Sequence, residues 1–125
     1  MKILLDVSVL VALVFKNHVH HAPARHWLAG KTPVLCPLTE LGFIRVALSP
    51  AHHATMDEAR RALADFYTDE AAEFLPADLP ALEGKPAPSA AKSTDWYLGN
   101  LADEHGLKWA TLDKQANHPA RELVA

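Results

Sequence analysis

The chain is short of cysteine, since Cys36 is the only one among its 125 residues. A single cysteine excludes an internal disulfide and cannot build a cysteine-rich zinc site. This usage is typical of a protein in a reducing cytoplasm. We therefore interpret Cys36 as a small buried hydrophobic residue.

The sequence also lacks a long uninterrupted apolar segment. Its most apolar segment, residues 3–15, falls short of the ~20 apolar residues that a membrane span needs. Asp6 interrupts this segment, and no small-residue cleavage site follows it, so it does not have the form of a secretory signal. We expect a soluble, cytoplasmic protein without a membrane partner.

Neither sign of charge is in large excess. The 12 Lys and Arg against 15 Asp and Glu give a net charge of −3, which taken alone argues mildly against a nucleic-acid partner. Hydrophobic residues make up 50% of the chain, which excludes general disorder. The length indicates one domain, residues 1–125.

The chain begins with a segment that combines an apolar run with one acid. Residues 2–5 predict a buried strand, Asp6 follows it directly, and residues 7–15 predict a helix with Ser8 in its first turn. In open α/β sheets, ligands bind beyond the carboxyl ends of the strands. Asp6 is therefore placed to face a site.

The rest of the sequence alternates between predicted helices and strands, which favours an α/β fold with a parallel sheet. A capping box, Thr55 with Glu58, opens one helix, whose core stripe we predict to be Met56, Ala59, Leu63, Phe66 and Tyr67. Ser93 and Thr94 are predicted to cap another. In the first half of the chain we predict a helix over 20–28, a strand over 34–36, and helices over 38–48 and 55–67. A strand over 71–75 and a long connection over 76–89, with a helical turn near 79–83, come next. The last predicted elements are a helix over 95–105 and a strand over 109–112.

Three further acids stand in apolar surroundings. Glu40 shares a helix face with Phe43 and Ile44, and Asp95 shares one with Leu98 and Ala102. Asp113 follows a strand as Asp6 does. A salt bridge or a helix dipole would explain Glu40 or Asp95 singly.

In a parallel sheet these four acids would project at one edge. Carboxylates within ~4 Å of one another repel by several kcal/mol at an effective dielectric of about 20, so a structural role explains them poorly. A divalent cation with oxygen ligands, Mg²⁺ or Mn²⁺, removes the repulsion. With four acids committed to metal, 11 acids would remain against 12 bases, which neither predicts nor excludes RNA.

Four segments together resemble the PIN domain, in particular the VapC-type ribonuclease toxins: residues 4–13, 39–45, 94–98 and 110–113. The resemblance implies a three-layer α/β/α fold with a central, mainly parallel sheet of four to five short strands, commonly as a homodimer. It also implies a Mg²⁺- or Mn²⁺-dependent endoribonuclease that a cognate antitoxin neutralises. By position, the residues that match the family's acids are Asp6, Glu40, Asp95 and Asp113. We expect the three aspartates to hold the ion, with Glu40 helping directly or through water.

The first motif departs from the family pattern at Ser8, where Asn is usual. A hydroxyl can still hydrogen-bond a carboxylate, so we expect altered tuning of the metal site. Thr111 is a candidate to orient a carboxylate, and Asn117 to assist Asp113. Arg45 is a candidate contact for an RNA phosphate or the antitoxin, with an exposed helix position as the alternative.

The histidines at 18, 20, 21, 26, 52 and 53 fit no recognised zinc pattern, and we interpret them as surface residues. His118 lies beyond the site or in solvent. Trp96 and Tyr97 either stack on a base or belong to the core or a dimer interface.

Two other functions remain open at this point. One is a different α/β enzyme, a phosphotransfer enzyme or phosphatase, that uses Asp6 as a nucleophile. However, the phosphatase pattern has an acid two residues after the first, where this chain has Ser8. The other is a catalytically weak or inactive PIN-like module that only binds a partner.

Overall fold

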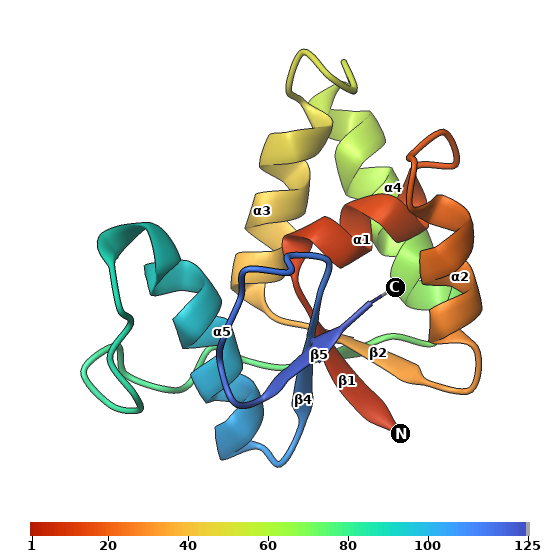
Figure 1. Cartoon of the computed structure of the whole chain (residues 1–125). Coiled ribbons are helices and arrows are strands. Elements are labelled where there is room, and N and C mark those ends of the chain that lie inside the picture. The colour runs from red at the N-terminus through yellow and green to blue at the C-terminus, as the bar shows by residue number, and fades with distance from the viewer. Residues whose placement is uncertain (125) are drawn as a thin grey trace.

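The computed structural model describes residues 1–124, which form a five-stranded sheet flanked by helices (Figure 1). The strand order is β3-β2-β1-β4-β5, and every neighbouring pair is parallel. The elements are β1 (Lys2–Leu5), α1 (Val7–Val14), α2 (His21–Leu28), β2 (Thr32–Leu35), α3 (Pro37–Ala47), α4 (Met56–Asp69), β3 (Glu73–Phe74), the 3₁₀ turn η1 (Ala90–Lys92), α5 (Ser93–Glu104), β4 (Lys108–Thr111) and β5 (Arg121–Leu123). The predicted three-layer α/β/α arrangement is confirmed.

The layers follow from the alternation of side chains along β1, the central strand. Ile3 and Leu5 point into one core together with residues of α1, α2, α3 and α4. Leu4 points into the opposite core, which it shares with Trp109 and with residues of α5. The side chains of Ile3, Leu4 and Leu5 are all fully buried. A strand covered on both faces needs apolar residues at successive positions, which explains the unbroken run.

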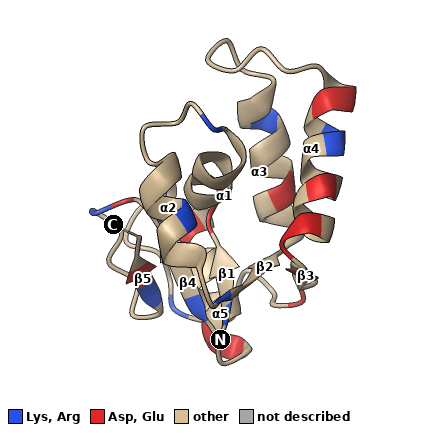
Figure 2. Cartoon of the chain, turned by 90° about the vertical axis from the view of Figure 1, so that its right-hand side faces the viewer, with Lys and Arg blue, Asp and Glu red and all other residues tan. Residues whose placement is uncertain are grey.

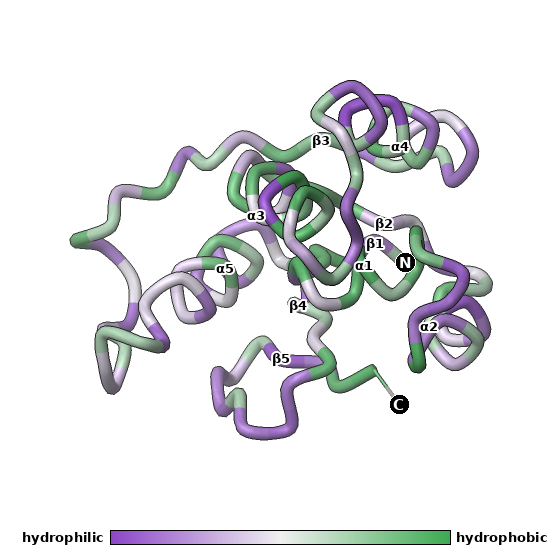
Figure 3. The backbone as a smooth tube through the Cα atoms, turned by 90° about the horizontal axis from the view of Figure 1, so that it is seen from above, coloured by the Kyte–Doolittle hydropathy of each residue, from purple (hydrophilic) through white to green (hydrophobic). Residues whose placement is uncertain are grey.

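Helix α1 lies centrally among the helices on its side of the sheet, and it is apolar over most of its surface (Figure 3). Its residues 9–13 are all buried. α3 approaches it very closely at Gly42, where an added Cβ would lie 2.3 Å from Cγ2 of Val7. Only a residue without a side chain fits there, so the separation of α1 and α3 depends on this glycine.

Four details differ from the sequence predictions. β5 was not predicted, because it is a three-residue edge strand with two charged residues. Lys92, and not Ser93, precedes the first turn of α5, because η1 leads directly into the helix and the Ser93 hydroxyl donates back to the Ser89 carbonyl (3.4 Å). Met56 is 49% exposed, since it opens α4 outside the packed turns. Around Leu79–Glu83 there is a turn and no regular helix.

The capping box that begins α4 is confirmed: Glu58 N–H donates to Thr55 Oγ1 (3.1 Å), and Thr55 N–H donates to Glu58 Oε1 (2.8 Å). Acidic residues occur along the length of α4, whereas its basic residues, Arg60 and Arg61, lie together in its first half (Figure 2). Within residues 1–124, none of the helices combines the length and the apolar character that crossing a membrane requires.

Candidate active site

Asp6 lies at the carboxyl end of β1, where the sheet positions it. Its backbone N–H donates to the carbonyl of Ala110 on β4 (2.9 Å), which continues the pairing of the two strands by one residue. One carboxylate oxygen, Oδ2, accepts hydrogen bonds from the hydroxyls of Ser8 (2.8 Å) and Thr111 (3.2 Å). The side chain is half-buried, and its orientation is fixed by these bonds from Ser8 of α1 and Thr111 of β4.

The same two hydroxyls also accept backbone hydrogen bonds from the β4 side. Leu112 N–H donates to Ser8 Oγ (3.3 Å), and Asp113 N–H donates to Thr111 Oγ1 (3.1 Å). Each hydroxyl therefore donates to the Asp6 carboxylate and accepts from a backbone N–H in the segment that ends at Asp113. Asp6 and Asp113 are linked through this network without an intervening positive charge.

Asp95, in the first turn of α5, is the third carboxylate at this edge. Burial raises its pKa above the ordinary value, and the negative charges of Asp6 and Asp113 raise it further. Lys92 acts in the opposite direction and lowers the pKa. The effect of Asp6 and Asp113 on the pKa of Asp95 reflects the proximity of the three carboxylates, although they come from residues 6, 95 and 113 of the chain.

Asp113 is the most open member of the group. Its side chain is exposed, and its Oδ1 accepts a hydrogen bond from the Gln115 N–H (2.8 Å). This local bond fixes the turn after β4 and keeps the carboxylate at the surface.

Glu40, in the first turn of α3, has a different partner. Its Oε2 accepts a hydrogen bond from the Tyr67 hydroxyl of α4 (2.8 Å), and it lines a hollow between α3 and α4. Burial and the Glu40 carboxylate both raise the pKa of Tyr67. Tyr67 is half-buried and packs against the apolar core as the predicted stripe of α4 requires, and its hydroxyl in addition holds an acid. The apolar face shared by Glu40 was the signal for such a partner.

Arg45 and Asn117 lie apart from this network. Arg45 is exposed in the last turn of α3, about 7.5 Å further along the helix axis than Glu40. Asn117 is exposed in the connection between β4 and β5. Among residues 1–124, neither side chain hydrogen-bonds to one of the four acids.

Sequence reasoning did not find Lys92. Its ammonium group donates to the Gln115 carbonyl (3.2 Å), which brings a positive charge to the rim of the acidic group. The available signal was its position one helical turn before Asp95.

His118 is buried, so the interpretation that places it in solvent is wrong. Its ring packs on Gly99 and meets the edge of the Trp96 ring at 4.7 Å between centroids. Trp96 is therefore in contact with the interior. The Tyr97 hydroxyl donates to the Leu79 carbonyl (2.8 Å), which ties α5 to the long connection.

The histidines near the N-terminal half are only partly surface residues, in contrast to the prediction. His20, His26 and His53 are exposed, whereas His18, His21 and His52 are half-buried. His52 stacks on Phe15 at 4.1 Å between ring centroids, and His21 Nδ1 lies 2.8 Å from the Ala12 carbonyl oxygen.

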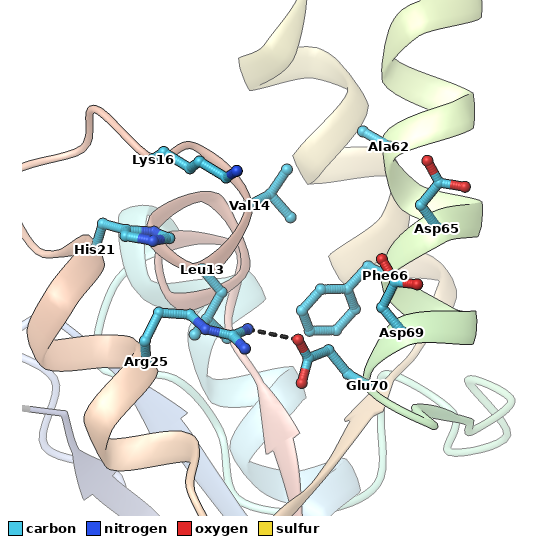
Figure 4. Close-up of a pocket in the computed structure, with 10 residues that line it drawn as sticks. All are labelled: Leu13, Val14, Lys16, His21, Arg25, Ala62, Asp65, Phe66, Asp69 and Glu70. Carbon is cyan, nitrogen blue, oxygen red and sulfur yellow. Dashed lines mark hydrogen bonds and ion pairs between the residues drawn. The ribbon is translucent and has the colours of Figure 1, made fainter.

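A second group of charged residues lines an open hollow of about 460 Å³ between α2 and α4 (Figure 4). Lys16 and Arg25 lie on one side of it, and Asp65, Asp69 and Glu70 lie on the other. Arg25 Nη1 forms an ion pair with Glu70 Oε1 (2.6 Å). Here acidic and basic side chains face each other, which is the arrangement that the sheet-edge group lacks.

The carboxylates of Asp6, Asp95 and Asp113 are near one another, but they do not converge on one point. Across the described part of the chain, residues 1–124, no three acidic, imidazole or thiol side chains are arranged closely enough to hold a metal ion as they stand. A metal bound there would need movement of the side chains. Asp113 is free to supply part of that movement because it is exposed.

The family comparison agrees with this fold. The model of the PIN domain matches residues 3–122. Among curated proteins of Mycobacterium tuberculosis, the chain is similar to Ribonuclease VapC38, with 34% identity over 88% of the chain and 84% of that protein. It is similar to Ribonuclease VapC29, with 33% identity over 94% of the chain and 90% of that protein, and to Ribonuclease VapC39, with 33% identity over 90% and 89%. The chain belongs to the PIN domain family, and within it to the VapC type.

Proposed function

We propose that this chain is an endoribonuclease toxin that hydrolyses RNA phosphodiester bonds with the help of Mg²⁺ or Mn²⁺. The observation that carries the proposal is the group of three carboxylates at the sheet edge, where the negative charges of Asp6 and Asp113 raise the pKa of Asp95. Carboxylates arranged in this way contribute little to stability, and a cation from outside the chain offsets their repulsion.

The donor set suits a hard divalent ion. Asp6, Asp95 and Asp113 offer only oxygen atoms, which Mg²⁺ and Mn²⁺ prefer over nitrogen and sulfur. Glu40 would help directly or through water. When bound, such an ion supplies a water of lowered pKa for attack on the phosphate and a positive charge against the developing negative charge.

The protein's own contribution is to orient and to bind. Ser8 and Thr111 hold Oδ2 of Asp6 and so fix the orientation of the carboxylate that would bind the cation. Among residues 1–124, three polar or charged residues are buried, and Thr111 is one of them, which fits a fixed positioning role. Lys92 at the rim is placed to attract the phosphate backbone of the RNA.

The names of the relatives extend the proposal to partners. Proteins named ribonuclease VapC imply, for this chain, an RNA substrate and a cognate antitoxin that neutralises it. We also propose that the chain acts in the cytoplasm as a homodimer.

The direct test is cleavage of total RNA by the purified chain with Mg²⁺, with Mn²⁺ or with EDTA, followed by mapping of the cut ends. We expect cleavage with either ion, none with EDTA, and none by the Asp6→Asn variant. Equal cleavage by parent and variant would show that the acidic group is not the active site.

Titration calorimetry with Mn²⁺ separates this function from a non-catalytic binding module. The proposal expects Mn²⁺ uptake by the parent chain and much weaker uptake by Asp6→Asn. A chain that takes up no Mn²⁺ at neutral pH and cleaves no RNA would be a binding module.

A further inference from the structure

Another hollow, separate from the two described above, lies directly beside the acidic group. Its volume is about 400 Å³, and its walls come from α1, α3, the segment after α1 and the residue after β4. The lining residues are Val7, Ser8, Val11, His18, His20, Val46 and Leu112. We call it the His18–His20 pocket. Four of its seven lining residues are valine or leucine, and none is Lys, Arg, Asp or Glu.

The pocket shares two residues with the network around Asp6. Ser8 lines the pocket and donates its hydroxyl hydrogen to Asp6 Oδ2 at 2.8 Å. Leu112 lines the pocket and donates its N–H to Ser8 Oγ at 3.3 Å. A group seated in the pocket would therefore lie next to any group held by Asp6.

The two imidazole rings give the pocket its polar and aromatic part. The ring centroids of His18 and His20 are 5.7 Å apart with a tilt of 41°, and the His20 N–H donates to His18 Nδ1 (3.0 Å). Because Nδ1 of His18 accepts, its neutral form carries the proton on Nε2 and can donate there.

The surroundings of His18 favour its neutral form. Burial lowers its pKa first, and the neighbouring His20, His52 and His21 lower it further. A neutral ring with a flat face and one N–H donor suits stacking and hydrogen bonding better than it suits capture of a phosphate.

We propose that the His18–His20 pocket holds one unpaired base of the RNA, next to the phosphodiester that the acidic group cleaves. A base is flat and apolar on its faces and polar at its edge, which matches an aliphatic wall with imidazole rings. Proteins that read single-stranded RNA commonly stack splayed-out bases on aromatic or histidine side chains. This inference rests on the proposed ribonuclease function and adds a site that gives the enzyme base preference.

Binding tests the pocket without depending on catalysis. Short, fluorescently labelled single-stranded RNA of random sequence is titrated onto the chain carrying Asp6→Asn, alone and combined with His18→Ala and His20→Ala. We expect the double alanine change to weaken binding about tenfold, the loss of roughly one base stack. The matched control is His26→Ala on α2, an exposed histidine outside the pocket, which should leave binding unchanged.

A second variant approaches the pocket from the opposite wall. Val46→Phe adds an aromatic ring from α3 while both histidines stay in place. It should also weaken RNA binding, because the added ring occupies the space meant for the base. This variant decides the matter if the histidine changes disturb the loop, and thermal melting checks that each variant is folded.

Mapping of cut ends in random-sequence RNA then tests the position of the base. With His18 and His20 intact, we expect a preference for particular bases at one position beside the cut, and the double alanine variant should lose it. Unchanged RNA affinity and unchanged base preference in both pocket variants would overturn the inference and leave the pocket to a protein partner. If the parent bound RNA through His18 and His20 but cleaved none, the pocket would stand and the proposed catalytic function would fall.

Discussion

Two groups of charged side chains in this molecule differ in what balances them. In the hollow between α2 and α4, Asp65, Asp69 and Glu70 face Lys16 and Arg25, and Arg25 pairs with Glu70 (Figure 4). At the sheet edge, Asp6 is held by two hydroxyls, and it shares the edge with Asp95 and Asp113. Asp6 and Asp113 raise the pKa of Asp95, and Lys92 lowers it.

The difference shows how a structural acid and a functional acid can be told apart. An acid paired with a basic side chain on the surface contributes modestly to stability and needs nothing more. A group of acids whose neighbours are hydroxyl groups and other acids is electrostatically unfavourable in the folded chain by itself. Such a group indicates a ligand of positive charge, and each prediction below separates the two groups by experiment.

The largest expected effect is that of Asp6→Asn on RNA cleavage. We expect a loss of more than about a hundredfold, because even residues that only support metal ligands cost about 10- to 100-fold when changed. Asp65→Asn in the hollow is the matched control, and the rate of RNA cleavage should stay the same. Similar losses in both variants would remove the distinction between the two groups.

Ser8→Ala tests the hydroxyl that holds Asp6. It removes a donor to Oδ2 and an acceptor for the Leu112 N–H, so we expect about a tenfold loss in Mn²⁺ affinity or cleavage rate. Ser8→Asn should keep most of the activity, because an amide both donates and accepts. Calorimetry with Mn²⁺ measures the first quantity. An unchanged Ser8→Ala variant would mean that Thr111 alone is sufficient.

Asp95→Asn should raise stability while it lowers activity. The pKa of Asp95 is raised in the folded chain, so its contribution to stability is present below its ordinary value of 3.8 and is lost as pH rises through the folded pKa. The neutral amide avoids that loss, and we expect a gain of about 1 kcal/mol or less at pH 7, since the side chain is partly exposed. Urea unfolding at pH 7 and near pH 3 measures it without added metal. The gain should vanish at the lower pH, and a gain that persists there would have another origin.

The smallest expected effect is that of Glu70→Gln, which breaks the ion pair with Arg25. Exposed ion pairs contribute about 0 to 1 kcal/mol, so the free energy of unfolding should fall by about 0.5 kcal/mol and the cleavage rate should not change. A double-mutant cycle with Arg25→Ala isolates the coupling. A large effect on cleavage would contradict the assignment of this hollow as separate from catalysis.

The sequence was informative where local pattern and burial agree. β1 and its following acid were predictable because a strand covered on both faces needs consecutive apolar residues, so the one acid is conspicuous. The capping box of α4 was predictable because both of its hydrogen bonds lie within four residues. The four acids remain proposed site residues, and what the fold adds is the proximity of three of them.

The remaining features depend on contacts between distant segments, which no local pattern encodes. Tyr67 meets Glu40 across 27 positions, and Lys92 reaches the edge only because η1 precedes α5. β5 is too short and too charged for its own residues to indicate a strand, and it forms because β4 offers it a partner. His118 looked polar in sequence, yet Gly99 leaves room for its ring.

Gly42 has no side chain that could take part in a reaction, yet its position in α3 affects the acidic group. It comes two residues after Glu40 and packs against Val7, the residue after Asp6, so the close approach of α3 to α1 beside these two acids depends on the missing methyl group. Inserting that group with Gly42→Ala would act as a wedge between α1 and α3. Gly42 thereby controls how closely α1 and α3 approach each other. We expect its enlargement to change the spacing of Asp6 and Glu40, although no acidic residue is replaced.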